Sequence, residues 1–489
     1  MKINVIYILT FFLLLSQACS KEKVTLVETK EDAPSLFPDY VGVTIPATIA
    51  PLNFTVEEKF SKIDAVVEGS LSGSLHVQGK SSIEFHKGKW AKLLRENEDG
   101  TLKVTVSIKS DKGWIQYAPF HIYISPFPID HGLVYRLIAP GYEVYSKMGI
   151  YQRALSNFSQ TALIENTILA SSCVNCHSFC VGDPKRMSLH LRGEYGATIL
   201  MSEGGLELYD TRTEQTGLSC VYPYWHPSGK YIAYSVNQTQ QVFHVADNKR
   251  IEVVDLRSDL VVYNLETNQL LSCPQLMVEN VFETFPSFSA DGRSLYFCSA
   301  EERTLPMEYD KIQYSLCRID FDPENGVFGQ KVDTLVSARE WNKSVSFPRP
   351  SYDGKYLMYT LSDYGNFSIW HKESDLWLMD LQTLEARELT EVNSENVDSY
   401  HSWSTNSRWF VFSSRRLDGL YTRPYIASID ESGMISKPFL LPQKDVDYYK
   451  NSLYSFNIPE FVSAPVDFNV RQVEKKALSQ ERIKFGYRE

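Results

Sequence analysis

The sequence has no long block of basic residues, and no long apolar run follows its first 15 residues. Its 489 residues carry 49 Lys and Arg against 60 Asp and Glu, which gives a net charge of −11. Nucleic acid binding depends on clustered Lys and Arg, so we exclude nucleic acid as a main partner. The Gly-x-Ser-x-Gly turn that carries the nucleophile of many hydrolases is also missing. The sequence therefore gives no support for an enzyme.

Aromatic residues, by contrast, are abundant. Tyr, Phe and Trp make up 13% of the chain, and hydrophobic residues as a whole make up 43%. This composition excludes a wholly disordered chain. Because aromatic residues favour strands and supply amphipathic rings, we expect β structure with binding surfaces.

The first residues are typical of a secretory signal. Lys2 precedes an apolar run over residues 5–15, which is too short to cross about 30 Å of hydrocarbon as a helix. Cys19 follows shortly after, and this arrangement resembles a bacterial lipoprotein signal. The resemblance implies a signal peptide over residues 1–18, a lipid on Cys19 and a tether over residues 19–39. We therefore expect a membrane-anchored chain in the envelope of a Gram-negative-type bacterium, at the outer membrane, on its periplasmic side or at the surface.

A motif recurs in the second half of the chain. Each clear copy begins with an aromatic residue, usually followed by Pro, and it ends in a polar turn such as Asp-Gly. The clear copies begin at Tyr222, Phe285 and Phe347, a degenerate copy begins at Tyr400, and a still weaker copy begins at Ile458. Each clear copy runs into an alternating apolar strand, and an apolar strand with a polar hairpin follows. Four strands per unit, at a spacing of about 50–60 residues, predict the blades of a β-propeller.

These repeats resemble the Pro-Asp-Gly-Lys blades of the TolB-like propeller family. The resemblance implies an all-β propeller over residues 186–470, with six blades where we count five. We expect any sixth blade to come from residues 130–170. The hairpin strand at Leu206 has no inner-strand motif before it, and the inner strand at Pro459 has no hairpin after it. We therefore expect these two ends to share one blade that closes the ring.

The remaining segments differ from the repeats. Residues 40–130 alternate apolar and polar positions between turn signals, which predicts a small β-sandwich-like domain. Residues 131–185 form a predicted connector, with a helix from Asn157 to Ala170, and residues 471–489 form a C-terminal tail.

The connector contains Cys173, Cys176 and His177 in the spacing Cys-x-x-Cys-His, the attachment motif of c-type haem. The two thiols are spaced to add across the vinyl groups of the haem, and His177 is placed to bind the iron on the proximal side. The distal ligand would then be Met187, His190 or Met201. The sequence thus predicts one haem c, used in electron transfer or in haem-dependent sensing.

Other interpretations of this motif stay open. Cys173 and Cys176 can form a disulfide, and Cys180 offers another partner. The three thiols with His177 or His190 also have a spacing that suits tetrahedral zinc. The motif can equally be inert. The chain would then be a haem-free scaffold whose propeller binds a protein or a glycan in an envelope assembly.

Charged and histidine side chains in the blade loops are candidates for a binding site at one mouth of the ring. The polar stretch from Asn237 to Ser258 is an unusually long insertion within one blade, and inserted loops are frequent binding elements. Cys298 and Cys317 lie on consecutive strands of one blade, where they either form a bridge or pack as buried thiols. The candidate mouth residues are His226, His244, Arg250, Arg349 and His401.

Overall fold

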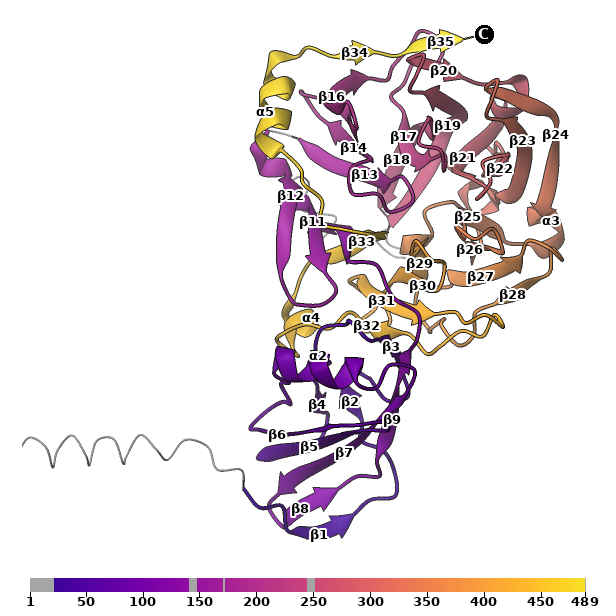
Figure 1. The fold of residues 1–489 in the computed structure, drawn as a ribbon. Helices are drawn as coiled ribbons and strands as arrows, with labels where there is room; N and C mark the ends of the chain where they lie inside the picture. The colour runs from indigo at the N-terminus through magenta and orange to yellow at the C-terminus, as the bar shows by residue number, and fades with distance from the viewer. Residues whose placement is uncertain (1–21, 140–146, 170–171, 244–250, 489) are drawn as a thin grey trace, which may run out of the picture. The chain divides into compact units, whose positions relative to one another are not determined.

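The computed structural model describes residues 22–139, 147–169, 172–243 and 251–488 (Figure 1). The predicted all-β fold class is confirmed, since 49% of the residues lie in strands and 9% in helices. The chain divides into two compact units, and each is described by itself.

The first unit comprises the described residues up to Gly42 together with Pro51–Ile124. Its main sheet has the strand order β1-β8-β7-β5-β6; β9 pairs with the start of β7, and β2 and β4 form a separate ribbon. Helix α2 (Lys87–Arg95), which the alternating pattern does not predict, begins after the cap His86 and buries Trp90. The strands are β1 (Leu26–Thr29), β2 (Leu36–Phe37), β4 (Thr55–Val56), β5 (Lys62–Gly69), β6 (Ser74–Gly79), β7 (Thr101–Ser110), β8 (Gly113–Gln116) and β9 (Phe120–Ser125).

The second unit is a β-propeller, with six blades in the part of the chain that the structure describes. Blades 1 to 5 each consist of four consecutive antiparallel strands, the first of them innermost. Blade 1 holds β13 (Cys173–Phe179), β14 (Met187–Arg192), β15 (Ala197–Ser202) and β16 (Gly205–Asp210); blade 2 holds β17 (Val221–Trp225), β18 (Tyr231–Phe243), β19 (Ile251–Asn264) and β20 (Gln269–Leu271). Blade 3 holds β21 (Val281–Phe288), β22 (Ser294–Glu301), β23 (Ser315–Asp322) and β24 (Val327–Val336); blade 4 holds β25 (Ser344–Pro350), β26 (Tyr356–Ser362), β27 (Asp375–Asp380) and β28 (Ala386–Glu388). Blade 5 holds β29 (Asp398–Trp403), β30 (Trp409–Ser414), β31 (Arg423–Ser428) and β32 (Phe439–Leu440).

Blade 6 closes the ring with strands from two distant parts of the chain. Its inner strand β33 (Ser455–Val462) pairs with β10 (Gly132–Ile138), followed by β11 (Met148–Ala154) and β12 (Gln160–Glu165). The sixth blade thus comes from the expected region, but the predicted sharing of a blade with Leu206 is wrong. The strand that holds Leu206 already has β13 as its inner strand.

The helix expected from Asn157 onward is also wrong where the structure describes it. Residues 160–165 form β12, paired with β11, and a short 3-10 helix η1 (Asn166–Ile168) follows. The near-helical spacing of apolar residues is overridden here, because β11 offers unpaired backbone groups along the edge of blade 6.

The hydrophobic core lies between neighbouring blades. One cluster joins Tyr231 and Val262 of blade 2 to Phe288 and Ile319 of blade 3. A single blade cannot cover both of its faces, so each blade depends on the next around the ring.

The C-terminal segment binds the outer edges of two blades. Helix α5 (Val470–Ser479) precedes β34 (Ile483–Lys484), which pairs with β16, and β35 (Gly486–Arg488), which pairs with β20 (Figure 1). Covering these edges removes unpaired strand groups from solvent. No helix among the described residues is both long and apolar enough to cross a membrane. The other short helices are α3 (Ala338–Trp341), α4 (Tyr448–Asn451), η2 (Pro274–Leu276), η3 (Tyr309–Lys311) and η4 (Ser368–Trp370).

Candidate functional site

Every inner strand of the propeller has one residue with a left-handed backbone at the same place. Their φ angles lie between 50° and 52°, a region that non-glycine residues rarely adopt, and strand pairing shifts register at this point in every blade. The six residues, in blade order, are Cys176, Tyr222, Phe285, Phe347, Tyr400 and Ile458.

The Cys-x-x-Cys-His motif is therefore the blade 1 copy of the repeat. Cys176 takes the place of Tyr400, and His177 takes the place of His401, which is Pro in the other four blades. The sequence-based prediction missed this copy because it has neither the aromatic residue nor the Pro. The short match of Cys-His-Ser-Phe to Tyr-His-Ser-Trp in blade 5 is the signal that could have found it.

The described residues around this motif do not fit a haem. Cys173 and Cys176 are each 6% exposed and His177 is 2% exposed, so the thiols face packed protein. Cys173 lies in the core between blades 6 and 1, with Ile150 and Leu189. Burial lowers the pKa of His177 to about 4, and nearby backbone groups only partly oppose this. Neither ring nitrogen makes a well-formed hydrogen bond.

The candidate distal ligands lie on the next two strands of the same blade. Met187 and Met201 are directly opposed across β14 and β15, and both belong to the core cluster between blades. His190 is buried and its Nδ1 lies 3.2 Å from the Thr198 hydroxyl. These side chains fill the blade, as most core methionines do.

The cysteines near the motif are separate thiols. Cys173, Cys176 and Cys180 are all unbridged, and among the described residues no three His, Cys, Asp or Glu side chains converge as metal ligands. Cys298 and Cys317 are also unbridged, because they point to opposite faces of blade 3: Cys298 packs toward blade 4 and Cys317 toward blade 2.

Two of the predicted mouth histidines are packed within the blades. His226 Nε2 meets the Gly292 carbonyl at 3.1 Å, which joins the turns of blades 2 and 3. His401 Nε2 donates to the Met358 carbonyl at 3.0 Å, and burial lowers the pKa of His401 to about 3. His244 and Arg250 lie outside the described residues.

Two positions after each left-handed residue, the inner strands contribute a ring of side chains near the axis. This ring is Ser178, Tyr224, Ser287, Arg349, Ser402 and Glu460. All but Ser287 line one pocket, which we call the axial pocket, with Phe179, Gly182, Pro350, Tyr352, Trp403 and Phe461. The empty space within it, open solvent included, is about 370 Å³, and the space that the centre of a water-sized sphere can occupy is about 20 Å³. This space suits about one water molecule, so only a small group of a larger ligand can enter it.

Arg349 and Glu460 give the axial pocket its charge. The Arg349 guanidinium lies 5.1 Å from the centre of the Tyr224 ring and donates to the Pro348 carbonyl at 3.0 Å. The backbone N–H of Phe179 donates to Glu460 Oε2 at 3.0 Å. Burial raises the pKa of Glu460 to about 7, against the attraction of Arg349. Arg349 was predicted as a mouth residue; Glu460 was missed because it lies in the weakest copy of the repeat.

Aromatic side chains fill the axis next to this pocket. The ring centres of Tyr222 and Phe285 are 4.9 Å apart, those of Phe285 and Phe347 are 4.0 Å apart, and those of Phe347 and Tyr400 are 4.8 Å apart. These residues belong to one hydrophobic cluster, so the axis is packed rather than open at this level.

The described parts of the long polar insertion, residues 237–243 and 251–258, extend strands β18 and β19 and contact residues of blades 3 and 4. Asp255 accepts hydrogen bonds from Asn237, from Tyr314 at 2.8 Å and from Asn366 at 2.5 Å. Burial raises the pKa of Asp255 to about 6, although these donors oppose it. Glu252 accepts from the Tyr364 hydroxyl at 2.5 Å and meets His371 Nε2 at 3.0 Å. Asp255 and Glu252 thus anchor the hairpin stem, although Asn237 Oδ1 and His371 Nδ1 are buried without a hydrogen-bond partner.

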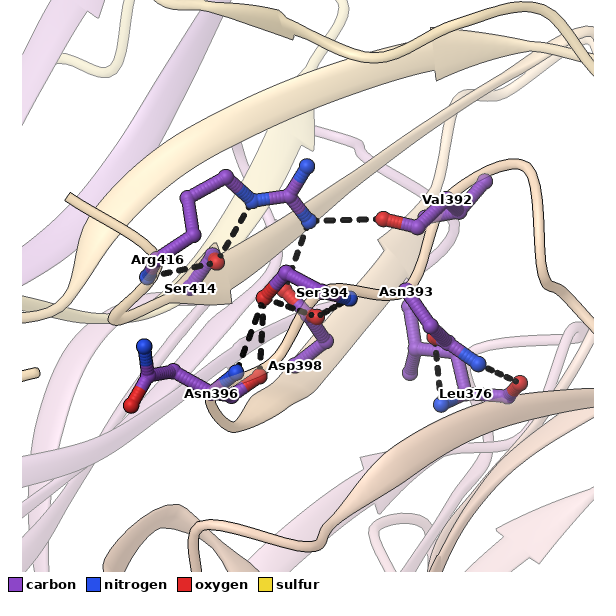
Figure 2. Close-up of polar contacts among 8 residues, drawn as sticks. All are labelled: Leu376, Val392, Asn393, Ser394, Asn396, Asp398, Ser414 and Arg416. Atoms are coloured by element: carbon purple, nitrogen blue, oxygen red, sulfur yellow. Dashed lines mark hydrogen bonds and ion pairs between the residues drawn. The ribbon is translucent and has the colours of Figure 1, made fainter.

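An ion pair between the partly exposed Arg416 and the buried Asp398 holds the loop that leads into blade 5. Arg416 donates to Asp398 Oδ1 at 2.7 Å and to the Val392 carbonyl at 2.7 Å, while Ser394 donates to Asp398 Oδ2 (Figure 2). The guanidinium also lies 4.5 Å from the centre of the Tyr425 ring. At the equivalent place, blade 1 has Val174.

Comparison with known proteins finds resemblance in fold only. No family model and no curated protein matches the chain. A prolyl oligopeptidase B from Galerina marginata, solved with a 35mer substrate, has a TM-score of 0.35 at 11% identity, over 62% of this chain and 44% of that chain. A DUF4784 family protein from Bacteroides caccae has a TM-score of 0.30 at 10% identity, over 73% and 95%. Dipeptidyl peptidase 4 from Porphyromonas gingivalis has a TM-score of 0.28 at 11% identity, over 60% and 42%.

Proposed function

We propose that this chain is a binding scaffold of the bacterial cell envelope, in which the propeller holds a ligand group at the axial pocket. The observation that carries the proposal is the axial pocket, where five of the six blades bring one side chain each to the axis. A carboxyl group, a guanidinium group and two hydroxyls meet there beside Tyr224 and Tyr352. A few placed polar groups among aromatic side chains are typical of a ligand pocket.

The chemistry of the axial pocket favours a small group that both donates and accepts hydrogen bonds. Arg349 can only donate, whereas the ionised Glu460 can only accept. Sugar hydroxyls and peptide amides both meet this requirement, so the partner is a glycan or a protein. Because only about one water-sized group fits into the pocket, the rest of this partner stays outside it.

The envelope location rests on the amino-terminal signal. In the proposed arrangement a lipid on Cys19 holds the propeller at the membrane, and membership of the TolB-like family is part of the same proposal. Neither depends on the axial pocket. The lipid anchor has its own test: a Cys19→Ala chain is expected to leave the membrane fraction.

The haem hypothesis is a weaker alternative. It rests on the Cys-x-x-Cys-His spacing alone, and the buried strand position of Cys173, Cys176 and His177 argues against it.

A binding comparison tests the scaffold proposal. The Cys19→Ala chain is applied to a glycan array and to an array of envelope-protein peptides, beside the variants Glu460→Gln and Arg349→Met. We expect a restricted set of ligands of one class, whose affinity falls about tenfold or more in both variants. Arg387→Met serves as the control, because Arg387 lies on the exposed outer strand of blade 4. Equal binding by all four chains, or no binding by any, would contradict the proposal.

A further inference from the structure

Three arginines lie at the end of the propeller axis opposite the axial pocket. In the register of the strands, Arg136 of β10 lies opposite Asn457 of β33, and Arg192 of β14 lies opposite Cys173 of β13. Arg415 follows β30 of blade 5, whose last residue pairs with Asp398. These partners all precede the left-handed residue of their inner strands, whereas the axial pocket residues follow it. The two groups of residues therefore lie at opposite ends of the axis.

The three arginines act on two equivalent side chains, and Arg136 acts on both of them. Burial raises the pKa of the Cys176 thiol, and Arg192 and Arg136 both oppose this. Burial also raises the pKa of Tyr400, and Arg136 and Arg415 both oppose that shift. Cys176 and Tyr400 occupy the equivalent left-handed position in blades 1 and 5, on either side of blade 6. Blades 5, 6 and 1 thus bring three positive charges to one side of the axis.

Two of these arginines are incompletely satisfied. The Nε atoms of Arg136 and Arg415 are shielded from solvent, yet neither has a hydrogen-bond partner. Arg415 lies 4.4 Å from the centre of the Trp370 ring, and Arg136 Nη2 is 3.7 Å from Met148 Sδ. Like charges brought together with unpaired donors are unfavourable unless an anion compensates them.

The acidic groups nearby are already used. Asp418, the carboxylate that acts on Arg415, forms an ion pair with Arg423 at 3.6 Å. Asp255, which faces Tyr222 from the hairpin, is supplied by the three donors described above. Neither Arg136 nor Arg415 thus forms an ion pair with a carboxylate among the described residues.

We propose that Arg136, Arg192 and Arg415 form a binding site for an oxyanion, that is, a carboxylate, sulfate or phosphate group. The planar guanidinium fork matches such groups, and Arg415 is held in place by its stacking on Trp370. The site shares no residue with the axial pocket, so it stands or falls independently of the proposed function.

Anion titrations test this site. Sodium phosphate, sodium sulfate and sodium glucuronate are each added to the Cys19→Ala chain at constant ionic strength, maintained with sodium chloride. Binding is followed by calorimetry and by tryptophan fluorescence, which reports on Trp370 beside Arg415. We expect saturable binding of at least one anion, weakened about tenfold or more by the double change Arg136→Gln, Arg415→Gln. The exposed control Arg387→Gln is expected to bind as the parent chain does.

A second variant guards against a folding defect in the double variant. Arg192 is exposed, so Arg192→Gln leaves the core intact, and we expect it to weaken binding about threefold or more. A preference for glucuronate identifies an acidic sugar as the source of the oxyanion, whereas a preference for phosphate or sulfate identifies the free ion or a phosphorylated or sulfated ligand. No saturable binding of any of the three anions, or equal binding by the parent, the double variant and Arg192→Gln, would overturn the site.

Discussion

Blades 1 and 5 have the same inner-strand plan but carry different chemistry. Cys176, His177 and Ser178 in blade 1 occupy the places of Tyr400, His401 and Ser402 in blade 5. In blade 5, His401 donates a hydrogen bond to the Met358 carbonyl of blade 4. In blade 1, neither ring nitrogen of His177 makes a well-formed hydrogen bond. Blade 1 thus carries the Cys-x-x-Cys-His spacing on a strand that follows the inner-strand plan of the propeller repeat.

The largest expected effect on stability comes from opening the ring at blade 6, which lies between blades 5 and 1. Deleting residues 454–489 removes β33, so β10 keeps β11 but loses its inner partner, and the surfaces of blades 1 and 5 that pack on β33 are exposed. We expect aggregation and loss of cooperative thermal unfolding. Deleting only residues 482–489 removes two edge strands and should leave a folded ring. A soluble product with unchanged thermal stability after the longer deletion would contradict closure through blade 6.

The next effect tests where blade 5 differs from blade 1. Asp398→Val gives blade 5 the residue that blade 1 has at Val174 and leaves Arg416 without its carboxylate. We expect a loss of about 3 kcal/mol in the free energy of unfolding, measured with urea, because Asp398 is fully buried. In the exposed pair of Arg387 and Glu391, Glu391→Ala should cost about 0.5 kcal/mol or less. Equal costs for the two changes would show that the blade 5 pair contributes no more than a surface pair.

A pH comparison separates blade 6 from blades 1 and 5, which have Ser178 and Ser402 where blade 6 has Glu460. The pKa of Glu460 is raised in the folded chain to about 7 from 4.5. The folded chain therefore binds more protons between these values, and stability falls as the pH rises from about 4.5 to 7. We expect Glu460→Gln to remove about 1–3 kcal/mol of this fall, seen as the difference between parent and variant unfolding at pH 5 and pH 8. Parallel pH profiles would mean that Glu460 is ionised throughout.

The smallest effect concerns the histidine itself. His177→Pro gives blade 1 the residue that four other blades have, and it removes a buried imidazole without a well-formed hydrogen bond. We expect no loss and a gain of up to about 1 kcal/mol in the free energy of unfolding. His401→Pro should instead lose about 1 kcal/mol, because it breaks the bond to Met358. If both changes destabilise equally, the two histidines have the same structural role.

Much of the propeller could be predicted, since the copies at Tyr222, Phe285 and Phe347 keep the aromatic residue, the Pro and the Gly turn. The ring closure could not be predicted, because the Cys176 copy has neither the aromatic residue nor the Pro that identifies the inner strand of the other blades. The helix expected at residues 157–170 failed for a different reason, since pairing with β11 outweighs a local spacing of apolar residues.

The sites were predicted less well than the fold. Arg349 stood out as a charged residue within a clear repeat, but Glu460 and the three arginines are ordinary residues in sequence. Arg136, Arg192 and Arg415 lie far apart along the chain and meet only because blades 5, 6 and 1 are adjacent in the closed ring. Had β13 been recognised as the inner strand of blade 1, β33 would have been left for a separate blade 6 between blades 5 and 1.

The most direct test of the central claim is the mass of the mature chain, produced with a working cytochrome c assembly system and denatured in the absence of reductant. If Cys173–Phe179 is an ordinary inner strand, the mass will equal that of the haem-free chain, Cys173 and Cys176 will react with a thiol reagent after unfolding, and a denaturing gel will show no haem stain. A mass larger by one haem, lost in the double change Cys173→Ala, Cys176→Ala, would contradict the account.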